Sequence, residues 1–144
     1  MRLMLAAALT GLALTSACGS PAPSTDPADA KSICDITIQA RNTARAALAA
    51  VSASLAQERP STTDIAQASD DLKATFAALH SAIAATAEQT GEPELKAKIT
   101  AYQVSVELAI VVVEGADGDP AKLAGAIELP EMRSAEQAVT DACG

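Results

Sequence analysis

Three observations predict an all-α fold, an up-down-up-down antiparallel four-helix bundle. Four segments repeat apolar side chains at three- and four-residue steps, which is the spacing of one helix face. Proline or glycine separates each segment from the next, as expected for turns between helices. The chain has 144 residues, of which 49% are hydrophobic but only 1% aromatic. Its apolar content is therefore largely alanine, the strongest helix former, and its length favours one domain.

The first helix is predicted over residues 27–58. Asp26 is suited to cap its N-terminus and Pro27 to occupy its first position. Arg59-Pro60 ends the helix, because the residue before proline avoids helical geometry. The predicted inward stripe comprises Ile33, Ile36, Ala40, Ala44, Ala47, Val51 and Leu55.

The second helix is predicted over residues 61–89 and has the most regular stripe. Ser61 caps it, with Asp64 three residues later as in a capping box. Thr90-Gly91 closes it. The inward side chains are Ile65, Ala68, Leu72, Phe76, Leu79, Ile83 and Ala87.

The third helix, over residues 92–114, competes with a strand. Its helical stripe comprises Leu95, Ile99, Tyr102, Val106, Ile110 and Val113. The β-branched alternation from Tyr102 to Val112 also suits a strand. We favour the helix because the chain offers no second strand, and an isolated strand leaves its backbone groups unpaired.

The fourth helix is predicted over residues 120–143, with a kink or a restart at Pro130, which removes a backbone donor. Three short connections make neighbouring helices antiparallel, so the end of this helix returns to the start of the first. We therefore expect a disulfide between Cys34 and Cys143 that joins the termini of the domain. The alternative is two free, buried cysteines. Such a bridge closes a loop of over a hundred residues and contributes about 4–5 kcal/mol.

The N-terminal segment has the features of a secretory signal. Met1 and Arg2 precede the apolar run 3–14, and small residues follow it. The run is too short to span a bilayer. These features predict an exported protein.

The stretch Leu14-Thr15-Ser16-Ala17-Cys18 resembles the lipobox of bacterial lipoprotein precursors, although that family usually has leucine where Thr15 stands. The resemblance implies cleavage between Ala17 and Cys18 and a diacylglycerol, with palmitate-type chains, on the Cys18 thiol. It divides the chain into a signal peptide (1–17), a flexible tether (18–26) and the helical domain (27–144). The expected location is the extracytoplasmic face of the cell membrane, with the membrane held through the anchor at Cys18.

Cysteine count and charge agree with this interpretation. The chain has three cysteines, so lipidation of Cys18 leaves an even pair, as an oxidising compartment favours. The net charge is −8, and without Arg2 nine basic side chains oppose eighteen acidic ones, a net charge of −9. This charge disfavours nucleic acid and adhesion to anionic lipid, so membrane contact is expected through acyl chains alone.

No catalytic or metal-binding pattern is found. His80 borders the apolar stripe without a Glu-x-x-His partner, and Met132 is the one methionine beyond the signal. Asp117-Gly118-Asp119 lacks the later acidic ligand of a calcium loop, and a turn with a helix cap explains it. Neither a Gly-x-Ser-x-Gly elbow nor a phosphate-binding glycine loop is present. We therefore expect no enzyme activity, cofactor or metal.

The third helix carries a second apolar row of Val104, Leu108, Val111 and Val112. Either this helix is the most buried one, or the row is a surface for a protein partner or a lipid chain. The leading hypothesis is a lipid-anchored interaction or structural module with an envelope protein as partner.

The alternative hypothesis is a carrier that binds an apolar small molecule or lipid between helices. It requires a pocket, for which Leu72, Phe76, Tyr102 and Val106 are the expected lining. Alanine-rich faces bring helices close together, so no cavity of drug size is expected.

Overall fold

The computed structural model describes residues 29–144, which form five α-helices and no β-strand. The all-α prediction is confirmed for these residues, and the segment that competes with a strand is a helix. The helices are α1 (Ala30–Leu55), α2 (Thr62–Gln89), α3 (Pro93–Glu114), α4 (Pro120–Ile127) and α5 (Pro130–Cys143).

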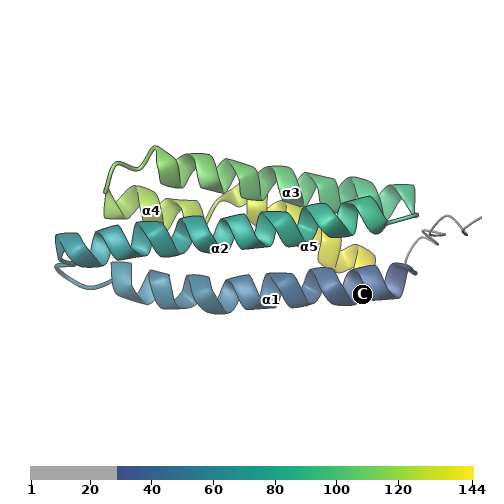
Figure 1. The fold of residues 1–144 in the computed structure, drawn as a ribbon, viewed down its shortest axis with the longest axis horizontal. Coiled ribbons are helices and arrows are strands. Elements are labelled where there is room, and N and C mark those ends of the chain that lie inside the picture. The colour runs from purple at the N-terminus through teal and green to yellow at the C-terminus, as the bar shows by residue number, and fades with distance from the viewer. Residues whose placement is uncertain (1–28) are drawn as a thin grey trace, which may run out of the picture.

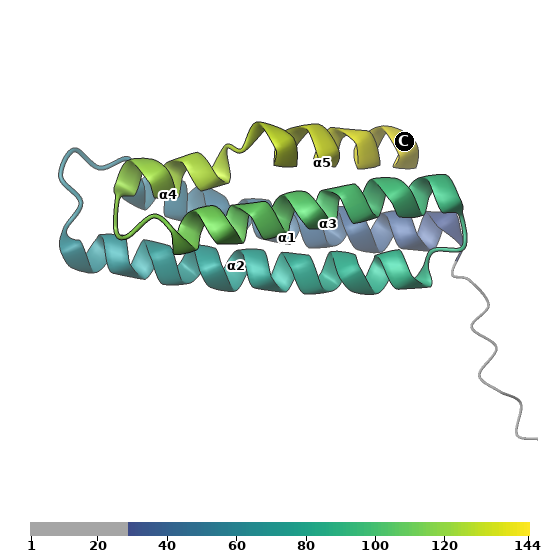
Figure 2. The ribbon, with the colours of Figure 1, turned by 90° about the horizontal axis from the view of Figure 1, so that it is seen from above.

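The helices lie along one common long axis (Figure 1). α1, α2 and α3 lie side by side, and α4 and α5 follow one another in line beside α3 (Figure 2). α2 packs against α1 and α3, while α5 packs against α3 and, less extensively, α1. The α1–α2 and α3–α4 connections lie at one end of the molecule, and the α2–α3 connection lies at the other end, where α5 stops (Figure 1).

The core is centred on α2 and α3. Phe76, Leu72 and Ile83 of α2 are fully buried, as are Ile99 and Val106 of α3. The stripes predicted for these two helices are confirmed, except that Ile65 and Ile110 are only half-buried at the edge of the core. Large side chains at regular spacing leave one face that can be buried, so the pattern determines the orientation of each helix.

The stripe predicted for α1 is partly wrong. Ile36 and Ala47 are exposed, whereas Thr37 and Leu48 are buried. Alanine occupies several faces of this helix, so more than one row is equally apolar and the neighbouring helices select among them. Buried Thr37 is satisfied within the helix, because its hydroxyl donates to the Ile33 carbonyl oxygen at 2.8 Å.

α1 is shorter than the predicted range 27–58. It begins at Ala30, where the Asp29 side chain caps it by accepting from the Ser32 amide at 2.7 Å. Asp26 and Pro27 lie outside the described residues. The helix ends at Leu55, its last buried side chain, because the exposed residues 56–59 contribute nothing to the core that would hold another turn.

The α2 capping box is confirmed. The Asp64 amide donates to Ser61 Oγ at 3.1 Å, and the Ser61 amide donates to Asp64 Oδ2 at 3.0 Å. The other end differs from a glycine-closed helix, because Thr90 leaves α2 in an extended conformation. Its hydroxyl donates to the Thr86 carbonyl oxygen at 2.6 Å and so satisfies one group of the last turn.

The predicted helix 120–143 is two helices. Asp119 caps α4 by accepting from two backbone amides, and Leu129 separates α4 from α5. Pro130 is the first residue of α5, where its missing N–H costs no hydrogen bond. The interruption at this proline is therefore a restart.

Candidate functional site

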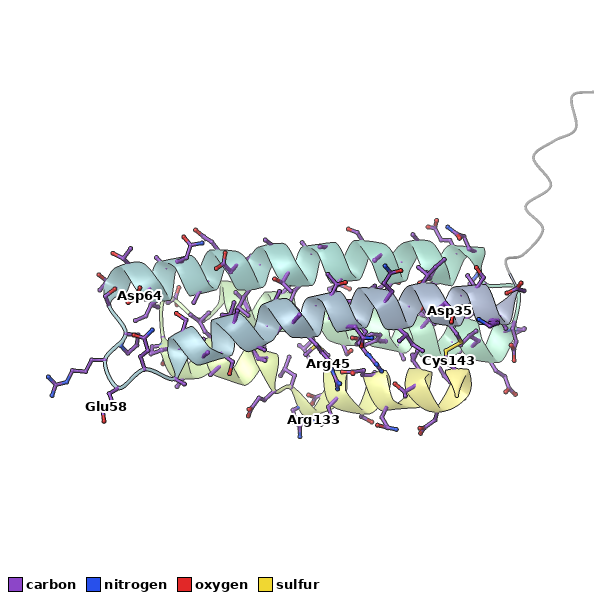
Figure 3. The ribbon with its side chains drawn as sticks, turned by 90° about the horizontal axis from the view of Figure 1, so that it is seen from below. Asp35, Arg45, Glu58, Asp64, Arg133 and Cys143 are labelled. Carbon is purple, nitrogen blue, oxygen red and sulfur yellow. A yellow bond between two sulfur atoms is a disulfide. The ribbon has the colours of Figure 1, made fainter. Side chains whose placement is uncertain are left out.

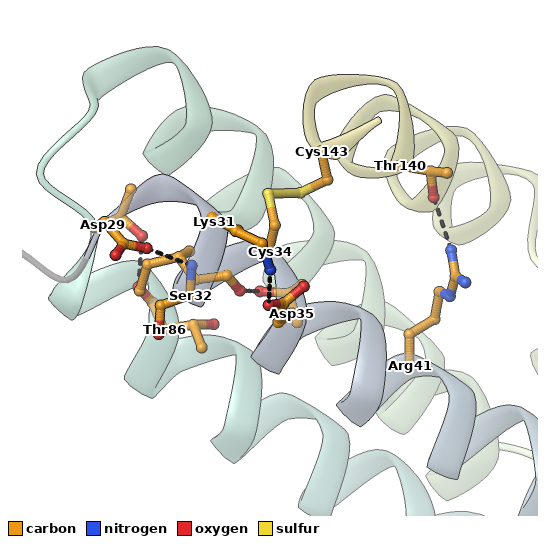
Figure 4. The surroundings of a disulfide bond; sticks show 12 residues. Asp29, Lys31, Ser32, Cys34, Asp35, Arg41, Thr86, Thr140 and Cys143 are labelled. Atoms are coloured by element: carbon orange, nitrogen blue, oxygen red, sulfur yellow. Dashed lines mark hydrogen bonds and ion pairs between the residues drawn. A yellow bond between two sulfur atoms is a disulfide. The ribbon is translucent and has the colours of Figure 1, made fainter.

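The cysteine pair is the sequence-predicted site that the structure brings together. Cys34 in the second turn of α1 and Cys143 at the end of α5 form a disulfide, with 5.4 Å between their Cα atoms (Figure 4). The predicted bridge is confirmed. It joins the last turn of α5 to the second turn of α1.

The second site that the sequence predicts at a cysteine is not among the residues that the structure describes. Cys18, the predicted lipidation site, lies outside the described residues, as do the predicted signal peptide 1–17 and the predicted tether 18–26. The described chain begins at Asp29, the cap of α1. Within residues 29–144, none of the helices combines the length and the apolar character needed to cross a bilayer.

The second apolar row of α3 is exposed in large part. Val104, Leu108 and Val111 are 58%, 41% and 57% exposed. Val112 is half-buried and packs against the core, so it belongs to the interior side of the row. Exposed Ala101 extends the row by one turn in its place. Three of the four side chains of the row are therefore exposed, and its interpretation as a surface for a partner stays a prediction.

An open groove lies between α1 and α2. Its volume is about 530 Å³. The residues that line it are Ile36, Gln39, Ala40, Thr43, Ala44, Ala47, Ala74, Thr75, Ala78, Leu79 and Ala82. The expectation that alanine-rich faces leave no space of ligand size is wrong here, because the short side chains of both helices leave their shared outer surface unfilled. The groove is not the pocket that the carrier hypothesis required, because Leu72, Phe76, Tyr102 and Val106 are buried in the core.

Sequence reasoning missed a polar cluster between α1 and α5. Glu136 Oε1 lies 2.7 Å from Arg45 Nη2 and 3.6 Å from Arg41 Nε. Arg41 also donates to Thr140 Oγ1 at 2.8 Å. The side chains of Arg41 and Glu136 are only 17% and 12% exposed, so this pair is largely desolvated. The available signal was the i, i+4 spacing of two arginines on a helix otherwise poor in charge.

Tyr102 lies close enough to this cluster to be influenced by it. Burial of the ring raises the pKa of its hydroxyl, the Glu136 carboxylate raises it further, and Arg41 and Arg45 offset part of the effect. The phenol is therefore neutral across the physiological range.

The other residues considered as possible ligands, His80 and the stretch Asp117-Gly118-Asp119, do not come together in one site. His80 is half-buried, and its Nε2 lies 3.3 Å from Gln103 Nε2. Asp117 and Gly118 form the α3–α4 turn with positive φ angles of 50° and 76°, and Asp119 serves as a helix cap. Across residues 29–144 no three His, Cys, Asp or Glu side chains gather in a way that could hold a metal ion.

No protein-family model matches this chain, and no curated protein or solved structure is significantly similar to it.

Proposed function

We propose that this protein is a lipid-anchored, extracytoplasmic helical domain of the bacterial envelope that serves as an interaction or structural module without catalytic activity. The anchor is a diacylglycerol on Cys18, and the partner is an envelope protein. The observation that carries the proposal is the exposed aliphatic row on α3. A surface of this kind on a domain whose core is already filled is typical of a binding face.

The proposed topology is an up-down-up-down antiparallel bundle in which α4 and α5 together form the fourth member. The contacts between helices and the placement of the connections at alternating ends support it. In this topology the disulfide lies at the end where α1 begins, so an anchor at Cys18 would hold the domain by its covalently closed end.

The spacing of the α3 row indicates the form of the partner. Ala101, Val104, Leu108 and Val111 follow one another at steps of three, four and three residues, which is a coiled-coil seam. Glu107 and Glu114 each lie three residues after a valine of the seam and border it on one side. The surface therefore suits an amphipathic helix whose apolar face is flanked by lysine or arginine.

The anchor is tested by fractionating cells that express the wild type and Cys18→Ala. We expect the wild-type protein in the membrane fraction and in the detergent phase, and the variant in the soluble fraction. Ser20→Ala, two residues away in the tether, is the matched control and should fractionate as wild type. Unchanged membrane association of Cys18→Ala would refute the anchor.

The α3 surface is tested by placing a photo-crosslinking amino acid at Leu108 or, as a control, at exposed Ser134 on α5. We expect a discrete adduct from position 108 that disappears when Val104 and Val111 are changed to serine. Both valines are exposed, so these changes should alter stability by no more than about 0.5 kcal/mol each. Identical adducts from positions 108 and 134 would contradict the proposal.

A second candidate function, a carrier for an apolar molecule, is supported by the α1–α2 groove. Six of its eleven lining residues are alanine and none is charged, which suits an extended alkyl chain. A larger side chain in the wall, Ala78→Phe, should fill the groove and abolish binding of a fluorescent alkyl probe. Ala77→Phe, at the neighbouring residue outside the lining, should leave binding unchanged. Equal binding by both variants would exclude the groove.

A further inference from the structure

A hollow of about 380 Å³ lies where α1 passes the break between α4 and α5. Four lining residues come from α1: Arg45, Leu48, Ala49 and Ser52. The other side is lined by Ile127 at the end of α4, Leu129 in the break, and Met132, Arg133 and Glu136 of α5. Its size is within the range of small-molecule sites. It exists because Pro130 restarts the helix, which leaves non-helical Leu129 between α4 and α5.

The hollow has two chemically different parts. Leu48 and Met132 are buried, and Ile127 and Leu129 are half-buried, so these four side chains form an apolar floor. Arg45, Arg133 and Glu136 form a charged rim, in which Arg45 comes from α1 and Arg133 from the first turn of α5 (Figure 3). A ligand that fills the hollow therefore contacts an apolar surface and charged groups at once.

The rim carries an excess of positive charge. Glu136 is the single carboxylate of the lining and is already paired with Arg45 and, one turn earlier on α1, with Arg41. Arg133 makes no ion pair or side-chain hydrogen bond within residues 29–144, and Arg45 is 62% exposed beside its pair with Glu136. The rim thus holds two arginines and one carboxylate, in a chain whose net charge is −8.

A guanidinium has five N–H donors in a planar fork, so Arg45 keeps free donors while it binds Glu136. Free donors on Arg45 and an unpaired Arg133 are the groups that a carboxylate or a phosphate needs. The apolar floor beneath them suits a short alkyl chain, because burying methylene groups is favourable.

We propose that this hollow is a binding site for an amphiphilic anion, whose head is held by Arg45 and Arg133 and whose alkyl chain lies over Leu48, Leu129 and Met132. A fatty carboxylate and an alkyl phosphate share this chemistry. The site uses neither the α3 row nor the α1–α2 groove and is independent of lipidation at Cys18, so it stands or falls separately from the proposed function.

The test uses the full chain with ¹³C-labelled methionine methyl groups, because Met132 is the one methionine within residues 29–144 and lines the hollow. Met132→Leu assigns its signal among those of the three methionines of the sequence. Octanoate and octyl phosphate are titrated to about 10 mM, the weak end of the affinity expected for ligands of this size. We expect a saturable shift of the Met132 methyl signal with one or both anions, and the tighter of the two identifies the head group.

Octanol and inorganic phosphate are the matched ligands that lack one half of the chemistry. We expect neither to reproduce the saturable shift. Octanol binding as tightly as the anions would refute the role of the arginines, and inorganic phosphate binding as tightly would refute the role of the alkyl chain. The absence of any saturable shift would overturn the site itself.

Arg133→Gln is the decisive variant, since Arg133 is exposed and the substitution removes no ion pair or side-chain hydrogen bond within residues 29–144. It should weaken binding about tenfold to a hundredfold, the worth of a charged hydrogen bond. Lys73→Gln removes an exposed positive charge from α2 outside the lining and should bind as wild type. An equal loss in both variants would reduce the effect to overall charge and refute the site.

Discussion

Two helix–helix interfaces of this domain are built from different chemistry. α2 packs against α3, and Leu72 and Phe76 of α2 and Ile99 and Val106 of α3 are fully buried members of one core. Between α1 and α5, the ties are the Cys34–Cys143 disulfide and the polar cluster around Glu136. One interface is stabilised by the apolar area that it removes from water, and the other by covalent and ionic links.

The difference follows from the side chains available. α1 is rich in alanine, and α5 buries only Met132 and Val139 in the core, with Ala135 and Cys143 at its margin. Short side chains bury little area per residue, so packing alone contributes less where α1 meets α5. The two interfaces should therefore respond to different perturbations, namely a cavity in the first and a reductant or a lost charge in the second.

The largest effect is expected from opening the covalent link. Cys34→Ala together with Cys143→Ala frees residues separated by 109 positions, and the stability loss should be about 4–5 kcal/mol in the chain-entropy model. Urea denaturation of the double variant, beside wild type with and without reductant, measures it. A loss below about 1 kcal/mol would mean that the α1–α5 contact is held by packing after all.

A cavity in the apolar interface should cost nearly as much. Phe76→Ala removes a fully buried ring and should lower the free energy of unfolding by about 3–5 kcal/mol. Ile36→Ala on α1 is the control, since that side chain is exposed and should change stability by less than about 1 kcal/mol. Both free energies of unfolding are measured by urea denaturation. Similar losses in the two variants would contradict the assignment of Phe76 to the core and of Ile36 to the surface.

The ionic part of the α1–α5 interface should contribute less than the disulfide. Glu136→Gln leaves the largely buried Arg41 without a charged partner and should cost about 2 kcal/mol. Glu131→Gln, an exposed acid in the first turn of the same helix, should change stability by no more than about 0.5 kcal/mol. Thermal denaturation of both variants separates these outcomes, and equal melting temperatures would show that the cluster is not stabilising.

The smallest effect is expected at the capping box, away from both interfaces. Hydrogen bonds from Ser61 lower the pKa of Asp64 from its ordinary value of 3.8. A lowered folded-state pKa gives stability that is present above pH 3.8 and is lost as the pH falls through the folded-state value. Asp64→Ala should therefore be less stable than wild type at neutral pH, and the gap should narrow in acid.

Thermal melts between neutral and strongly acidic pH check this linkage. Asp70→Asn removes an exposed carboxylate of the same helix that has no capping bond, and it should show no comparable gap. A gap for Asp64→Ala that stays constant with pH would assign the effect to helix propensity instead of the carboxylate.

The contrast between large apolar side chains and alanine also explains which structural predictions from the sequence succeed. The stripes of α2 and α3 were predictable because large side chains recur on one face of each helix. The inward face of α1 was not, since alanine makes several faces equally apolar and only packing selects Leu48 over Ala47. The disulfide was predictable from cysteine count and helix order, but the arginine cluster joins side chains as far as 99 positions apart that no local pattern connects.

What the sequence by itself determined is local: the helices, their caps at Ser61 and Asp119, and the break at Pro130, because each depends on neighbours within a few residues. The tertiary structure alone decided which apolar side chains stay outside, as on α3, and which charges meet, as at Glu136. Those outcomes depend on how distant helices compete for the same interior. Packing density and desolvation settle that competition, and neither acts until the chain is folded.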